Sequence, residues 1–136
     1  MNSITVMGES AGASSIMHHI TGNGGNIVLP FQKAVMQSPA FFPQYNPAAL
    51  DLQYYRFVKG VGCPWEDALE CLRKCSPRVL QRANQWETAH AEWGKFTFGP
   101  AVDGIYIHDL PGRELLNRNH FKNISILQGH NKFATI

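Results

Sequence analysis

The sequence has few charged residues and lacks both a surplus of one charge sign and a long apolar run. Charged side chains make up 16% of the 136 residues, and 12 Lys and Arg nearly balance 10 Asp and Glu. Scattered basic residues in such a balance predict no surface for nucleic acid or anionic lipid. No apolar run approaches the roughly 18 residues of a membrane span. We also expect no signal peptide in this chain, because no basic region followed by an apolar segment opens it.

Cysteine is sparse as well. The three cysteines are Cys63, Cys71 and Cys75, and an odd number leaves at least one unpaired within the chain. Their spacing lacks the paired C-x-x-C units of a structural zinc site, and no histidine stands nearby to complete one. We therefore expect neither a metal nor a cofactor.

The apolar fraction of 44% is typical of a globular domain, and the length suits one. Apolar, β-prone runs predict strands over residues 4–7, 33–37 and 123–129. Helices are expected over residues 11–19, 47–61, 65–73, 77–85 and 111–117, with strand and turn character over 95–104. The alternation of strands and helices predicts an α/β protein with a mostly parallel sheet. Three strands are few for an open sheet, which usually has about four to six.

The second of these helices has the clearest start. Asn46 is a preferred capping residue, and Pro47 suits the first helical position because its missing N–H would be unpaired there. An apolar face should follow at helical spacing, formed by Leu50, Tyr54, Phe57, Val58 and Val61.

Residues 8–12 carry the pattern G-x-S-x-G, as Gly8, Glu9, Ser10, Ala11 and Gly12. In this pattern a nucleophilic serine projects from a sharp turn between a strand and a helix, and the glycines let the two elements approach closely. The N–H of Ala11 would then face a developing oxyanion. Such a short pattern also occurs by chance in loops, but the expected strand before it and small-residue helix after it favour the functional interpretation.

Five segments together resemble one known family. They are ITVMGESAG (residues 4–12), FQKAVMQSPAF (31–41), GCPWEDALECLR (62–73), FGPAVDG (98–104) and LPGRELLNRNHFKNISILQGHN (110–131). In this order they are similar to type-B carboxylesterases, the group that contains cholinesterases and fungal lipases. The resemblance implies a partial α/β-hydrolase fold and hydrolysis of small-molecule or lipid esters through an acyl-enzyme. Ser10 would be the nucleophile and Ala11 an oxyanion donor.

The chain also departs from that family. The family's oxyanion-loop glycines would precede Met1, and its catalytic histidine would follow Ile136. Its triad glutamate would stand where this chain has Ala134, and an alanine cannot orient an imidazole. We therefore expect residues 1–136 to be an internal fragment of one type-B carboxylesterase domain, from a mis-assigned gene model or a pseudogene.

An internal triad is the alternative. Ser10, then Asp103 or Asp109, then His120 or His130 would satisfy the order serine, acid, histidine. The resemblance disfavours it, because Asp103 matches a turn and His130 a variable position. The remaining histidines are expected on the surface; they are His18, His19, His90 and His108.

Two further sets of residues have two interpretations each. Glu9, beside the nucleophile, is by resemblance a buried acid that either orients the site or is simply a satisfied carboxylate. The aromatic residues are expected mainly to pack in the core, although they could line an acyl pocket; they are Phe41, Phe42, Tyr45, Trp86 and Trp93.

The resemblance pairs Cys63 with Cys71 in a disulfide and leaves Cys75 as a free thiol. Asn123, Ile124 and Ser125 form an N-glycosylation sequon. Both features favour a secreted parent protein. Two other functions remain open: a non-catalytic cholinesterase-like binding domain, which the presence of Ser10 disfavours, and a truncated product without function.

Overall fold

In a computed structural model the chain forms two compact units, and the structure describes residues 3–40, 45–92 and 97–132. The sheet unit comprises Met1–Phe42 and Val102–Ile136, and the helical unit comprises Pro43–Ala101. The sheet unit contains β1 (Thr5–Glu9), α1 (Ala11–Thr21), the 3-10 helix η1 (Gly22–Gly25), β2 (Lys33–Gln37), α5 (Pro111–Leu116) and β3 (Ser125–Gly129). The helical unit contains α2 (Pro47–Val61), α3 (Ala68–Lys74) and α4 (Pro77–Ala89).

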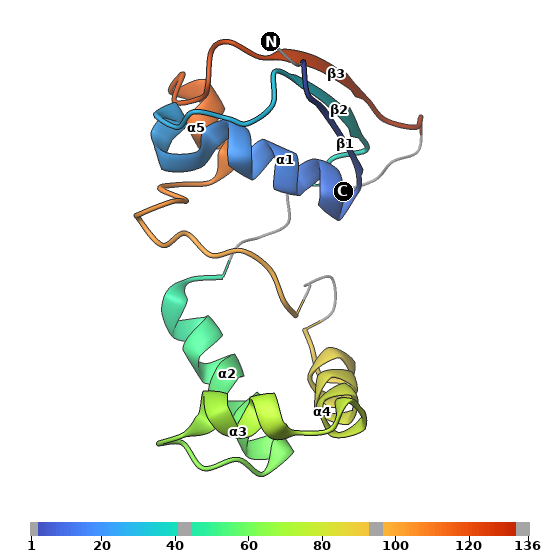
Figure 1. The fold of residues 1–136 in the computed structure, drawn as a ribbon, viewed down its shortest axis with the longest axis vertical. Coiled ribbons are helices and arrows are strands. Elements are labelled where there is room, and N and C mark those ends of the chain that lie inside the picture. The colour runs from blue at the N-terminus through green and yellow to red at the C-terminus, as the bar shows by residue number, and fades with distance from the viewer. Residues whose placement is uncertain (1–2, 41–44, 93–96, 133–136) are drawn as a thin grey trace. The chain divides into compact units, whose positions relative to one another are not determined.

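The three strands form a parallel sheet in the order β1-β2-β3. The register aligns Met7 with Val35 and Val35 with Leu127. Figure 1 shows α1 running along the sheet, as the crossover between β1 and β2 requires. The parallel α/β architecture expected from the sequence is confirmed. The bounds of β2 match the expected ones, β1 reaches Glu9, and β3 begins two residues later than expected.

The core of this unit lies between α1 and one face of the sheet. Four buried side chains of α1 are spaced at i, i+3, i+4 and i+7, which places them on one side of the helix. They pack with buried residues of β2 and of the loop before it; the cluster is Ala13, Ile16, Met17, Ile20, Leu29, Phe31, Ala34 and Met36. Burial of this face fixes α1 against the strands.

The opposite face of the sheet is exposed within the described residues. Met7 and Leu127, which flank Val35 in the register, are 73% and 68% exposed. Parallel sheets are usually covered on both faces. We name the row Met7, Val35 and Leu127 the open face.

The helical unit begins as its capping residues predict. The side chain of Asn46 accepts a hydrogen bond from the N–H of Ala49 at 2.8 Å, and Pro47 is the first residue of α2. Gly62 ends this helix with a φ of 86°, a left-handed conformation that suits glycine. Two helices differ from expectation: α3 begins at Ala68, after a turn that contains Trp65, and α4 extends to Ala89.

The expected apolar face of α2 borders a cavity of about 650 Å³ within the helical unit. Only Val58 of that face is fully buried, while Tyr54 is partly exposed. An ion pair of 3.3 Å joins Arg56 of α2 to the buried Glu87 of α4. The cavity is lined by Leu50, Gln53, Tyr54, Phe57, Leu72, Pro77, Leu80, Gln81, Asn84 and Phe98.

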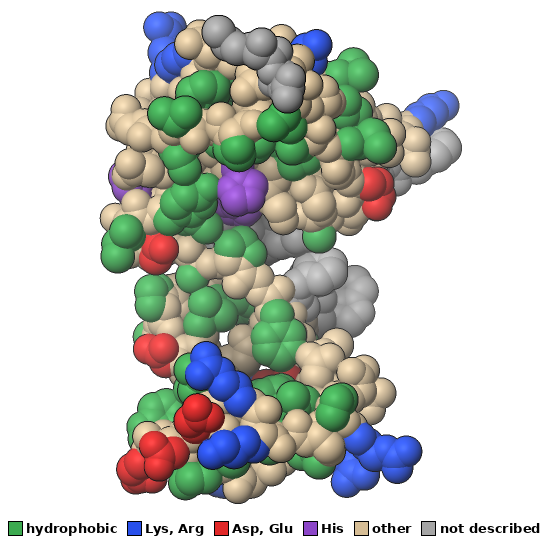
Figure 2. All heavy atoms as spheres, in the orientation of Figure 1, with side chains coloured by type: hydrophobic (Ala, Val, Ile, Leu, Met, Phe, Trp, Pro, Cys, Tyr) green, Lys and Arg blue, Asp and Glu red, His purple; other side chains and the backbone are tan. Residues whose placement is uncertain are grey.

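On the face drawn in Figure 2, apolar side chains reach the surface of both units, and Lys and Arg lie among Asp and Glu. Among the residues described, no helix is both long enough and apolar enough to cross a bilayer.

We predict that the open face drives self-association of the 136-residue chain, because an uncovered apolar sheet face favours intermolecular packing. Leu127→Lys should lower the associated fraction measured by size-exclusion chromatography with light scattering. Val28→Lys is the matched control, since Val28 is 89% exposed and lies outside the strands. Equal effects of the two substitutions, or a wild-type chain that stays monomeric, would contradict the prediction.

Candidate active site

Ser10 occupies a strained turn between β1 and α1. Its backbone has φ 54° and ψ −118°, a conformation that L-residues rarely adopt. Such a residue costs of order 1–3 kcal/mol and persists only where its surroundings impose it. Here its N–H donates to the carbonyl of Gln37 at 2.9 Å, and its own carbonyl accepts from the N–H of Ser14 at 3.0 Å. The sharp strand-to-helix turn expected from the G-x-S-x-G pattern is therefore present.

The hydroxyl of Ser10 is not used to cap α1. A serine preceding a helix commonly accepts a hydrogen bond from a backbone N–H of the first turn, but the Ser10 side chain makes no such bond. Ala11 is the first residue of α1, so its N–H has no acceptor within the helix. The half-buried Ser10 thus directly precedes the positive end of an 11-residue helix, whose first N–H groups have no acceptor within the helix.

Ser14, one turn into α1, anchors the segment that follows β2. Its hydroxyl accepts from the N–H of Ala40 at 3.0 Å, and its single hydrogen has the carbonyls of Ala40 and Ser10 as acceptors. Ser38 has a φ of 46° and donates its N–H to the carbonyl of Gly129 at 2.8 Å. The carboxyl ends of the strands are therefore tied to the turn at Ser10. Ser14 is not among the candidate residues singled out from the sequence, and its position one helical turn after Ser10 is the signal that could have found it.

The close approach of strand and helix depends on one of the two glycines. A Cβ at Gly8 would lie 2.5 Å from the carbonyl carbon of Gly12 and 2.8 Å from the backbone nitrogen of Ala13. A Cβ at Gly12 would meet no atom within 4 Å in the described structure. The expectation that both glycines provide close contact is thus correct for Gly8 and wrong for Gly12.

Glu9 is exposed at the end of β1. Within the described residues, the expectation of a buried acid at Glu9 is therefore wrong. The reason is that Glu9, two residues after Met7 on β1, lies on the same side of the sheet as Met7, and that face is exposed within the described residues.

Asp103 does not join a histidine. One of its carboxylate oxygens accepts hydrogen bonds from the N–H groups of Ile105, Tyr106 and Ile107, each at 2.9 Å. These bonds, the one from Ile105 first, hold the pKa of Asp103 below its ordinary value. The carboxylate therefore stabilises its own turn.

The other candidates for an internal triad also have local partners. Asp109 accepts from the N–H of Leu110 and pairs with Arg113 at 3.6 Å. The Nδ1 atoms of His120 and His130 lie 3.1 Å from the carbonyls of the residues that follow them. No hydrogen bond among the described residues connects the Ser10 hydroxyl, an aspartate and a histidine, so the internal triad is not assembled in this structure.

The remaining histidines differ in environment. His19, His90 and His108 are exposed as expected, and Nδ1 of His19 lies 2.7 Å from the hydroxyl of Tyr106. His18 is half-buried, which corrects its assignment to the surface. Burial lowers the pKa of His18, and the neighbouring His19 lowers it further.

The aromatic residues follow the core expectation only in part. Tyr45 is half-buried and bridges to Ala101, whereas Trp86 is 51% exposed and stacks on His90 with ring centroids 4.3 Å apart. Phe41, Phe42 and Trp93 lie outside the described residues, as does Ala134 at the position of the triad acid.

The disulfide between Cys63 and Cys71 is present, with a Cα–Cα distance of 5.8 Å, and Cys75 is a free thiol. Both expectations are confirmed. The three sulfur atoms form the only group of three or more His, Cys, Asp or Glu ligands found close together in the described part of the chain. Because two of them are bonded to each other, this group offers one thiol in the oxidised chain.

A sequence profile with the description "Carboxylesterase family" matches residues 1–136. Carboxylesterase patB of Penicillium expansum is 34% identical over 130 residues, which are 93% of this chain and 22% of that protein. Lipase 2 of Geotrichum candidum is 30% identical, with coverage of 93% and 25%. Acetylcholinesterase of Electrophorus electricus is also 30% identical, with coverage of 95% and 21%.

Solved structures are similar as well. EstA of Aspergillus niger superposes with a TM-score of 0.73 at 27% identity, over 90% of this chain and 25% of that one. PNB esterase gives a TM-score of 0.73 at 25% identity, over 94% and 27%. The chain thus spans about a quarter of the length of each of these five proteins.

We predict opposite responses to alanine at the two glycines. Gly8→Ala should destabilise the chain by about 1–3 kcal/mol, because the new methyl group would overlap backbone atoms. Gly12→Ala should be neutral or stabilising by up to about 1 kcal/mol, because alanine is a better helix former and no atom opposes it. Urea unfolding followed by circular dichroism checks both, and similar midpoints for the two variants would contradict the prediction.

Proposed function

The chain belongs to the carboxylesterase family, and from this premise we propose that it is the nucleophile-bearing part of a carboxylic ester hydrolase. The supporting observation is the strained turn at Ser10, which directly precedes α1 and whose side chain makes no capping hydrogen bond to that helix. A backbone strain of this kind is typical of a site where geometry serves the reaction. It favours catalysis over a non-catalytic binding domain, for which the strain would have no use.

In the proposed reaction, the Ser10 oxygen attacks the ester carbonyl and a general base removes the hydroxyl proton. The N–H of Ala11 stabilises the oxyanion of the tetrahedral intermediate, helped by the positive end of α1. The alcohol then leaves with a proton, and an acyl group stays on Ser10. Water, deprotonated by the same base, attacks the acyl-enzyme and releases the acid. We propose small-molecule or lipid esters as substrates.

The base, its orienting acid and further oxyanion donors are proposed to come from outside these 136 residues. The candidate acids and histidines of the sheet unit are engaged in local hydrogen bonds. Without a base, Ser10 is an ordinary alcohol at neutral pH, and triad members act as a unit. The 136 residues by themselves are therefore proposed to be inactive.

We predict that the isolated 136-residue chain hydrolyses p-nitrophenyl acetate no faster than its Ser10→Ala variant and that a fluorophosphonate probe does not label Ser10. A longer protein that adds the missing triad and oxyanion-loop segments should show both activities. Ser10→Ala should lower its kcat by about 10⁴-fold or more, since the nucleophile is lost.

Ser15→Ala is the matched control in the longer protein, because this exposed hydroxyl of α1 bonds, among the described residues, to the carbonyl of Ala11 alone. It should leave both activities nearly unchanged. Ser10-dependent turnover by the isolated chain would revive the internal triad, and a longer protein without Ser10-dependent turnover would refute the proposed hydrolase.

We further propose that the parent protein is extracellular. The Cys63–Cys71 disulfide suits an oxidising compartment. Asn123 is exposed in a bend two residues before β3, where a glycan has room. This bend lies at the amino end of β3, whereas Ser10 follows the carboxyl end of β1 in the same parallel sheet, so a glycan there would not cover the nucleophile.

We predict that the protein, secreted from a eukaryotic host, carries an N-glycan at Asn123. A glycan slows the protein on an electrophoresis gel, and treatment with peptide N-glycosidase F removes it. Asn123→Gln should abolish the shift that this glycan causes. Asn119→Gln, at an exposed asparagine outside any sequon, should leave it intact. An unmodified Asn123 in tryptic peptides of the secreted protein would overturn this assignment.

A further inference from the structure

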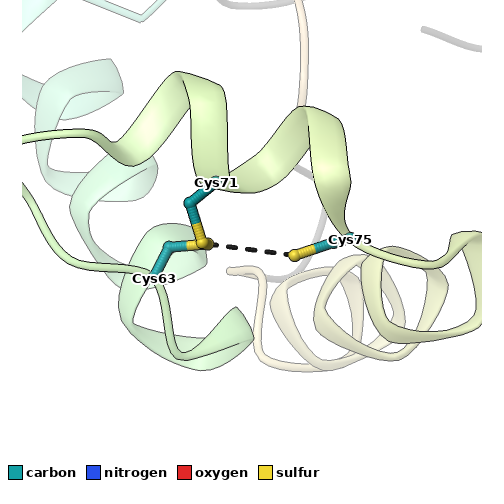
Figure 3. Close-up of a disulfide and its surroundings, with 3 residues drawn as sticks. All are labelled: Cys63, Cys71 and Cys75. Atoms are coloured by element: carbon teal, nitrogen blue, oxygen red, sulfur yellow. Dashed lines mark hydrogen bonds between the residues drawn. A yellow bond between two sulfur atoms is a disulfide. The ribbon is translucent and has the colours of Figure 1, made fainter.

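The free thiol of Cys75 lies against the disulfide. Its sulfur is 3.9 Å from the sulfur of Cys63, and all three cysteine sulfurs lie within 4.8 Å of one another. Figure 3 shows the Cys63–Cys71 bridge and the side chain of Cys75 pointing toward it. Cys71 is within α3, and Cys75 directly follows the last residue of that helix.

We propose that Cys75 exchanges with this bridge, so that the three cysteines form one redox unit with two disulfide isomers. The thiolate of Cys75 attacks the sulfur of Cys63, a Cys63–Cys75 bond forms, and the Cys63–Cys71 bond breaks. Cys71 leaves as a thiolate and takes up the proton that Cys75 gave to solvent. One disulfide and one thiol stand on each side of the reaction, so no oxidant or reductant is needed.

Access and position set the rate of this exchange. Cys75 is half-buried, so solvent can accept its proton. In-line attack on Cys63 requires the Cys75 sulfur to lie on the extension of the Cys71–Cys63 bond. There it would be about 2 Å farther from the Cys71 sulfur than from the Cys63 sulfur, because an S–S bond is about 2 Å long. The 4.8 Å limit excludes that arrangement, so Cys75 lies beside the bond. In-line attack therefore requires rotation of the Cys75 side chain or a local shift at the end of α3, and we expect exchange over minutes to hours.

The two isomers are close in chain entropy. The bridged residues are 8 apart in sequence for Cys63–Cys71 and 12 apart for Cys63–Cys75. In the loop-closure treatment this difference changes the equilibrium by less than about twofold. The native packing around α3 therefore decides which isomer predominates.

Exchange would move the tether from the middle of α3 to its end. Leu72 follows Cys71 in the sequence, and Pro77 lies two residues after Cys75. Both residues line the cavity of the helical unit. The choice of isomer would thus change which residue near this wall of the cavity is covalently linked to Cys63. The consequence is a thiol-dependent device in the helical unit that does not involve Ser10.

Trypsin can separate the isomers by mass. Cleavage after Lys59, Arg73, Lys74 and Arg78 places Cys63 and Cys71 in one peptide, residues 60–73, and Cys75 in another, residues 75–78. The disulfide seen in the structure leaves these peptides separate, whereas the Cys63–Cys75 isomer joins them. Cleavage after Glu70 then distinguishes Cys63 from Cys71 as the joined residue.

The experiment incubates the oxidised protein without reductant, alkylates free thiols with iodoacetamide and digests the gel-purified monomer. We expect the joined peptides, with alkylated Cys71, to increase with time. Their rate of formation should increase from pH 6 to pH 8, because the thiolate is the attacking species. Alkylation of Cys75 alone at every time and pH would overturn the proposal.

Two variants test the same geometry. Cys71→Ser should form the Cys63–Cys75 bond on air oxidation, whereas Cys75→Ser should keep the Cys63–Cys71 bond and never yield joined peptides. A folded Cys71→Ser chain that retains two free thiols after oxidation would refute the proposed contact. Circular dichroism establishes that each variant is folded, and if Cys71→Ser does not fold, the wild-type time course still decides.

Discussion

The turn at Ser10 is the constraint on which the sheet unit depends. Between β1 and α1 the chain reverses at a residue with positive φ, and this reversal brings the start of the helix against the end of the strand. The reversal is possible only because Gly8 leaves space for the carbonyl of Gly12. A strained conformation needs compensation elsewhere. Here the apolar face of α1, buried against β2, holds the helix in the position that the turn demands.

Hydrogen bonds around the turn extend this order to the carboxyl ends of the strands. The Ser10 N–H bonds to Gln37, the Ser38 N–H bonds to Gly129, and Ser14 bonds to both Ser10 and Ala40. Ligand sites of open parallel sheets lie beyond the carboxyl ends of the strands, which is where Ser10 stands. The described residues therefore fix the backbone of Ser10 and connect it to the ends of β2 and β3, and no hydrogen bond among them links the Ser10 hydroxyl to a histidine or an acid.

The helical unit has a different kind of constraint. The Asn46 cap and the left-handed Gly62 set the two ends of α2, and the Arg56–Glu87 ion pair joins this helix to α4. A short covalent loop then holds α3 through Cys71. The sulfur of Cys75 lies 3.9 Å from that of Cys63, and this neighbouring thiol is what the proposed exchange of the bridge requires.

Sequence by itself determined the features that depend on neighbouring residues. The turn at residues 8–12 follows from the G-x-S-x-G pattern, and the start of α2 follows from the capping preference of Asn46 and Pro47. The bounds of β2 follow from β-propensity. All three signals act over a few residues. The resemblance to carboxylesterases supplied the Cys63–Cys71 pair. Only the tertiary structure decided that Glu9 is exposed and that Gly8, not Gly12, provides the close approach of strand and helix. It also showed that Ser14 connects the turn at Ser10 to the end of β2. In the same way, it decided that Asp103 is engaged by its own turn and that Cys75 lies against the bridge. Each of these depends on which backbone or side-chain atoms the fold brings within a few ångströms, and no local pattern encodes that distance.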